Sequence, residues 1–170
     1  MGHFLTAIIG SETTLGQFSE MFGSPFPTAI PFGLWVLPLN EQRLDLLAMS
    51  GDRTFEGFEY LSPKIARAIA RGLGDGSALY VETFYHGGTG GQGAALLEDG
   101  ELIWTKAEST YKSENPNSIV AYRPFGPRLM KSPISEGLAR LGVVASSEHD
   151  EFDSVGLGNF RSLENLGLDY

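Results

Sequence analysis

The stretch YVETFYHGGTGGQGAALLEDGELIW, from Tyr80 to Trp104, carries the clearest information on how this chain folds. Apolar and β-branched residues around its glycines predict strands over 78–85, 94–97 and 101–106. Asp99-Gly100 separates the last two strands and favours a two-residue hairpin, because both turn positions prefer a positive φ. Strands joined by so short a turn run antiparallel, so the stretch predicts an antiparallel sheet.

The glycines from Gly87 to Gly93 are interpreted as the bend between the first two of these strands. A phosphate-binding loop leads into a helix and carries a nearby lysine, whereas here a strand follows and no lysine lies between Val81 and Ile103. The spacing of a dinucleotide fingerprint is present, but that motif also requires a helix after it. We therefore expect a hairpin loop or a bulge, whose exposed tip could contact a ligand or partner.

The flanking sequence adds helices and further strands. Strands are predicted over 3–9 and 34–37, and helices are predicted to begin after capping residues. Residues 58–61 could be a short strand or an extended link, and 119–122 an edge strand. The expected caps are Ser11, Asn40 (for a helix through Met49), Ser62 and Ser132. Strands and helices do not alternate strictly, so we expect a single α+β domain over 1–170, with a mainly antiparallel sheet and helices packed on one face.

Composition excludes several classes of function. The 170 residues contain no cysteine, so disulfides, thiolate nucleophiles and sulfur-ligated metals are excluded, in keeping with a cytoplasmic protein. The net charge of -9 disfavours nucleic acid, and no apolar run approaches the roughly 20 residues that span a bilayer. The acidity serves solubility, and it would also suit a basic protein partner.

Two groups of residues are candidates for a functional site. Glu82 and His86 share one face of a predicted strand, but they lie about 13 Å apart, too far for a hydrogen bond, so we expect a half-exposed polar edge. The sequence EHDEFD, at 148–153, lacks the spacing and the glycine of a calcium loop. It is interpreted as a solvated acidic segment that could meet a basic partner.

Three segments together resemble a family of short uncharacterised bacterial proteins: MGHFLTAIIG at the start, YVETFYHGGTGGQGA in the middle and DEFDSVGLGNFRSLEN near the end. The element YVETxYxGGxGGQ is its most distinctive part. In size, acidity and α+β build, such proteins are similar to the immunity proteins of bacterial toxin systems. The resemblance implies protein binding, and it supplies no catalytic residue.

The leading hypothesis is therefore a non-catalytic protein-binding protein, an immunity-type antidote, with no cofactor and no bound metal. One expected contact is the acidic segment, with Glu148, Asp150, Glu151 and Asp153. The other is the glycine loop, with Tyr85, His86, Gly87, Gly88 and Gln92. The alternative is a small enzyme or small-ligand-binding protein whose pocket at 82–93 includes Glu82, Tyr85, His86 and Gln92.

Overall fold

A computed structural model of the chain describes residues 2–48, 51–124, 126, 128 and 130–169. Within these residues, seven strands form one sheet in the order β2-β3-β1-β4-β5-β6-β7, and only the β6–β7 pair is parallel. The strands are β1 (His3–Ser11), β2 (Thr28–Ile30), β3 (Leu34–Pro38), β4 (Ser77–His86), β5 (Thr89–Glu98), β6 (Glu101–Ser109) and β7 (Ala121–Tyr122). The α+β class with a mainly antiparallel sheet is confirmed.

Each α-helix begins at a side chain that accepts a backbone N–H of the first turn. The helices are α1 (Glu12–Glu20), α2 (Glu41–Leu47), α3 (Pro63–Leu73), α4 (Pro133–Arg140) and α5 (Glu151–Ser154), and the 3-10 turns are η1 (Leu157–Asn159) and η2 (Leu163–Leu166). The caps Ser11, Asn40, Ser62 and Ser132 are confirmed, and Asp150 caps α5. The helix predicted to reach Met49 ends at Leu47, and Met49 lies outside the described residues.

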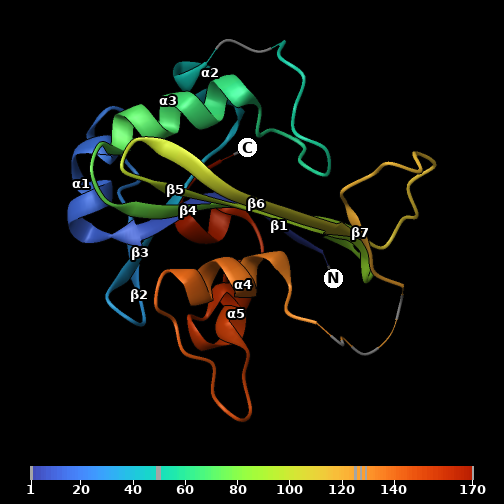
Figure 1. Cartoon of the computed structure of the whole chain (residues 1–170). Coiled ribbons are helices and arrows are strands. Elements are labelled where there is room, and N and C mark those ends of the chain that lie inside the picture. The colour runs from blue at the N-terminus through green and yellow to red at the C-terminus, as the bar shows by residue number, and fades with distance from the viewer. Residues whose placement is uncertain (1, 49–50, 125, 127, 129, 170) are drawn as a thin grey trace.

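Helices cover both faces of the sheet, whereas the sequence led us to expect them on one. Figure 1 shows α1, α2 and α3 on one side of the sheet and α4 and α5 on the other. The central strands explain this arrangement, because β4 is buried continuously from Ala78 to Thr83. Tyr80 packs in the core beneath α3, while its neighbours Leu79 and Val81 pack in the core beneath α4. A strand that buries both faces needs a covering layer on each side.

The glycine run forms a turn followed by a strand. Gly87 and Gly88 have φ values of 58° and 86° and connect the paired residues His86 and Thr89, so the predicted hairpin is confirmed. Strand β5 then begins at Thr89, earlier than the expected Ala94. Inside it, a Cβ on Gly93 would lie 2.6 Å from the ring of Phe58. Close approach of neighbouring groups therefore requires glycine within the strand as well as at the turn.

The other local predictions have mixed outcomes. The Asp99-Gly100 hairpin is confirmed, with φ values of 48° and 82°. Residues 119–122 contain the edge strand β7, and residues 58–61 form an irregular link. Across the part of the chain that the structure describes, every helix is too short or too polar to cross a membrane.

Candidate functional site

The sheet separates the residues that the sequence proposed for one pocket at 82–93. Glu82 lies beside Tyr80 on the face covered by α3, and the two side chains are hydrogen-bonded. Tyr85 and Gln92 line a hollow on the opposite face together with Phe152 of α5. Because side chains alternate along a strand, Glu82 and Tyr85 point to opposite faces. They do not share a hollow.

Glu82 is buried at the centre of the sheet, so the expected half-exposed polar edge is wrong at this position. Its side chain is 1% exposed, because β4 is a central strand of the sheet and the link at 59–61 packs over the carboxylate. Its carboxylate accepts hydrogen bonds from the backbone N–H of Glu59 (2.6 Å), Tyr60 (3.0 Å) and Leu61 (2.8 Å) and from the Tyr80 hydroxyl (2.6 Å). Burial raises the pKa of Glu82, and these hydrogen bonds offset part of that rise. Glu82 thus fixes the irregular link at 59–61 against the sheet.

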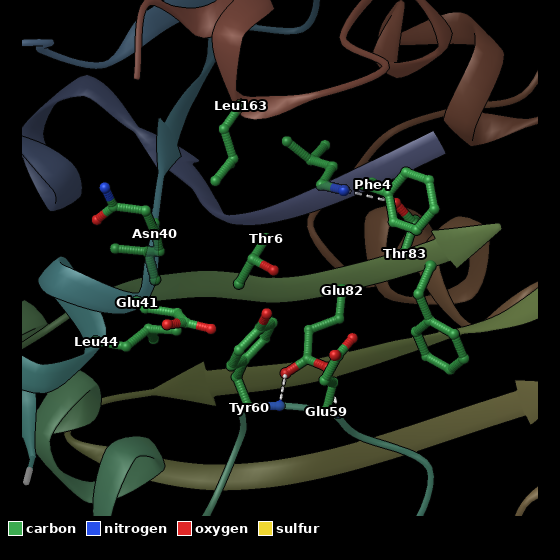
Figure 2. A pocket seen from close by; sticks show the side chains of 13 residues that line it. Phe4, Thr6, Asn40, Glu41, Leu44, Glu59, Tyr60, Glu82, Thr83 and Leu163 are labelled. Atoms are coloured by element: carbon green, nitrogen blue, oxygen red, sulfur yellow. Dashed lines mark hydrogen bonds between the residues drawn. The ribbon is translucent and has the colours of Figure 1, made fainter. Parts of the chain in front are cut away.

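Next to this link lies a hollow of about 290 Å³, which we call the acidic hollow (Figure 2). It lies between β1, β4, α2 and the link, which are far apart in the sequence. Its polar groups are the carboxylates of Glu41, Glu59 and Glu82, the hydroxyls of Thr6, Tyr60 and Thr83, and the amide of Asn40. Its apolar walls are Phe4, Leu5, Leu39, Leu44, Phe84 and Leu163. Within the described residues, no lysine, arginine or histidine lines it.

A second hollow, of about 360 Å³, continues from the first and shares Glu41, Leu44, Glu59 and Tyr60 with it. It adds Asp45, which follows Glu41 by one turn of α2, and Asp52, which is 3.2 Å from Lys64. The two hollows together are called the acidic groove. Glu41, Asp45 and Glu59 are exposed, and none forms an ion pair with another residue that the structure describes.

On the opposite face, a hollow of about 280 Å³ brings the two predicted contacts together. Tyr85, Gly88 and Gln92 of the hairpin line it with Asp150 of the acidic segment. The Gln92 amide already has partners: it donates to the Tyr85 hydroxyl at 3.2 Å and accepts from the Ile134 N–H at 3.2 Å. Asp150 accepts from the Asp153 N–H at 2.9 Å. The Gln92 bonds connect the hairpin to α4, whereas the Asp150 bond caps α5.

The acidic segment is only partly solvated. Glu148, Asp150 and Asp153 are exposed, as expected. Glu151 was expected to be solvated as well, and this expectation is wrong: its side chain is 2% exposed and forms an ion pair with Lys131. It occupies the first position of α5, where the helix turns it toward the protein, and a buried carboxylate needs such a cation.

The tip of the β4–β5 hairpin is exposed to solvent, as the sequence predicted. His86 and Gly87 are exposed at the tip between β4 and β5, and Gly88 is exposed beside them. Among residues 2–48, 51–124, 126, 128 and 130–169, no three histidine, aspartate or glutamate side chains gather as a metal site.

His3 lines the same hollow as Tyr85, and both nitrogens of its ring have hydrogen-bond partners. Leu157 O can only accept, so Nε2 carries the proton and donates to it at 3.3 Å. Nδ1 then accepts from the Thr83 hydroxyl at 2.6 Å. Burial, and to a smaller extent the charge of Arg161, lowers the pKa of His3 below 6.5, while the Leu157 hydrogen bond opposes this.

We expect the free energy of unfolding to fall as the pH drops below 6.5, because His3 is then protonated in the unfolded chain but still neutral in the folded chain. Urea denaturation at about pH 7.5 and about pH 5.5 measures this loss, which His3→Gln should reduce. His149→Gln, at an exposed histidine, is the control. An equal pH dependence in the wild type and His3→Gln would contradict the assignment.

Thr6, Glu41 and Glu59 line the hollow but were not predicted from the sequence. The available signal was the spacing of Glu41 and Asp45 on one helix that begins after Asn40. Nothing local marks Glu59 or Thr6, because they reach the hollow through the folding of distant segments. A search of protein-family models, of curated proteins and of solved structures returns no match to this chain.

Proposed function

We propose that this chain is a non-catalytic protein-binding protein whose partner presents a basic surface, and that it acts as an immunity-type antidote to a bacterial toxin. The acidic groove is the observation that carries the proposal. It is concave, and its exposed Glu41, Asp45 and Glu59 form no ion pair with any described residue. Carboxylates left without an internal cation remain available to a partner.

The charge of the whole chain supports the same class of partner. A net charge of -9 attracts a basic protein and speeds its association, and complementary charges at the contact favour the correct orientation. The resemblance to immunity proteins in size and acidity fits this role. An antidote of this kind would meet its toxin in the cytoplasm, with which the absence of cysteine agrees.

We propose the acidic groove as the main contact in place of part of the acidic segment at 148–153, which was the contact expected from the sequence. Asp150 caps α5 and Glu151 is paired with Lys131, so charge reversal at these positions would disturb the fold. Glu148 and Asp153 remain exposed, as does the hairpin tip with His86 and Gly87. We keep these residues as a second contact, tested by Glu148→Lys/Asp153→Lys.

Capture from a lysate of the source organism tests the groove. We expect the wild-type chain to retain a basic protein at low salt and to release it as salt screens the charges. Asp45→Lys/Glu59→Lys should reduce the amount retained by about ten-fold, because attraction becomes repulsion at the contact. Glu20→Lys/Glu101→Lys is the matched control, with the same change in charge at exposed residues outside the groove.

Quantitative mass spectrometry of the retained proteins gives the measurement, and circular dichroism confirms that each variant is folded. Equal retention by the groove variant and the control variant would reject the groove as the contact. Retention of no basic protein by the wild type would reject the proposed function itself.

A further inference from the structure

A hollow beside the edge strand β7 is basic, although the chain as a whole is acidic (Figure 1). It has a volume of about 440 Å³ and lies between β6, β7 and the described part of the segment that joins β7 to α4. Among the described residues of its lining, Glu108 is the only acid. We call it the basic hollow, because four of the 12 lysines and arginines of the chain line it: Lys106, Arg123, Arg128 and Lys131.

Two buried guanidinium nitrogens of this lining have no acceptor. Arg128 Nη2 lies 2.8 Å from Glu108 Oε1, whereas Arg128 Nη1 has no hydrogen-bond partner among the described residues. Arg123 Nη2 donates to Gly126 O at 3.3 Å, whereas Arg123 Nε has no partner in the same part of the chain. Buried polar groups are nearly always hydrogen-bonded. Two orphaned donors on side chains that line one hollow therefore indicate a missing acceptor.

The ion pairs of the lining show which charge lacks a counter-ion. Three of the four cations are already paired with carboxylates of the chain, in Lys106–Glu136, Arg128–Glu108 and Lys131–Glu151. Arg123 forms no ion pair with any residue that the structure describes. Glu108 does not oppose an anion in the hollow, because Arg128 neutralises its charge. The lining therefore has room for one more negative group.

We propose that the basic hollow binds a small organic oxyanion, a carboxylate or a phosphate ester, that accepts hydrogen bonds from Arg123 and Arg128. A guanidinium group only donates, and its planar fork matches the oxygens of either head group. Both orphaned nitrogens are buried, so each guanidinium rotates toward the ligand as it binds. The basic hollow shares no lining residue with the acidic groove, so this inference goes beyond the proposed function.

Exposed apolar side chains beside the cations favour a ligand with an apolar body. Tyr122 is 53% exposed and Met130 is 75% exposed, and both line the basic hollow. A tyrosine ring and a flexible thioether both pack well against an aromatic ring. An inorganic ion or a very small acid has no such surface to bury. We therefore expect an oxyanion carried on a ring to bind more tightly than the same head group alone.

Methyl resonances of Ala121 and Met130, which line the basic hollow, report on occupancy in an NMR titration at constant ionic strength. The probes are benzoate, phenyl phosphate, benzamide (the ring without the charge) and acetate (the carboxylate without the ring). We expect benzoate and phenyl phosphate to bind at least about five-fold more tightly than benzamide, and benzoate to bind about five-fold more tightly than acetate. The tighter of benzoate and phenyl phosphate identifies the head group.

The same titration can overturn the proposal. Benzamide that binds as tightly as benzoate and phenyl phosphate would overturn the anion assignment. Acetate that binds as tightly as benzoate would overturn the apolar body. If none of the four probes shifts either resonance, the basic hollow is not a ligand site.

Variants identify the groups responsible. Arg123→Gln removes the unpaired cation and should weaken benzoate and phenyl phosphate by about five- to ten-fold, whereas Arg67→Gln, at an exposed position of α3, should not. Arg128→Lys keeps a charge beside Glu108 but removes the fork, so we expect binding about three- to five-fold weaker. Arg71→Lys, also exposed on α3, is its control. Unchanged binding in both Arg123→Gln and Arg128→Lys would reject the assigned contacts.

The anion site and the proposed function fail separately. Arg123→Gln leaves the acidic groove intact, so it should retain the basic partner at the wild-type level. A failed titration leaves the result of the capture experiment standing, and a failed capture leaves the titration standing.

Discussion

Replacing Glu82 with alanine is expected to lower the free energy of unfolding by about 3–5 kcal/mol, because it removes the shared acceptor of several buried donors. The donors that lose it are the N–H groups of Glu59, Tyr60 and Leu61 and the hydroxyl of Tyr80. Alanine also leaves space beside Tyr80, which is fully buried. Urea denaturation at neutral pH measures the loss, and a decrease below about 1 kcal/mol would contradict the role assigned to Glu82.

Glu82→Gln is the control that preserves size. Its amide oxygen can accept some of these hydrogen bonds, while its NH₂ group meets donors, so we expect an intermediate loss of about 2 kcal/mol.

The difference in the free energy of unfolding between the wild type and Glu82→Gln should also depend on pH. Burial raises the pKa of Glu82 above 4.5, so the folded state keeps its proton to higher pH than the unfolded state does. The stability of the wild type relative to Glu82→Gln should therefore be greatest below pH 4.5 and fall as the pH rises through the pKa of the folded state. A relative stability that rises over this interval would show that the hydrogen bonds outweigh burial.

Gly90→Ala is expected to destabilise the chain by roughly 3 kcal/mol or more, enough to reduce the yield of folded protein. Gly90 has a φ of 137°, which side chains rarely adopt, and an added Cβ would lie 1.9 Å from Phe84 O. That oxygen belongs to the backbone of the paired strand β4, so relief requires movement of the hairpin itself. Thermal and urea denaturation of the purified variant give the measurement.

Gly87→Asn is the matched control within the same glycine run. Gly87 has a φ of 58°, a Cβ there would meet nothing within 4 Å, and asparagine tolerates this left-handed region. We expect a change within about 1 kcal/mol. A similar loss in both variants would show that close approach of β4 is not the reason for glycine at position 90.

The link at 59–61 joins stability to the proposed function. It has no regular secondary structure. Its position depends on the carboxylate of Glu82, which lies 23 residues after Glu59 in the chain. Weakening Glu82 should therefore disturb the wall of the acidic hollow as well as the core. The capture variants therefore change Asp45 and Glu59 and leave Glu82 unchanged.

Local chemistry was sufficient for the parts of the fold that depend on neighbouring residues. Ser62-Pro63 marks the start of α3 because the serine accepts an N–H of the first turn and the proline needs no partner there. Asp99-Gly100 marks the β5–β6 hairpin because both residues adopt a positive φ. The α+β class follows from such signals, since helix starts and hairpin turns are decided within a few residues.

Tertiary structure alone decided which side chains are buried and which of them meet. The sequence could not show that Glu82 lies inside the sheet, because its burial depends on β1, β5 and the link packing around it. Nor could it show that helices cover both faces, or that Thr6, Glu41 and Glu59 line one hollow. A side chain's environment is set by whichever distant segments fold against it, and the pattern of its neighbours in the chain does not contain that information.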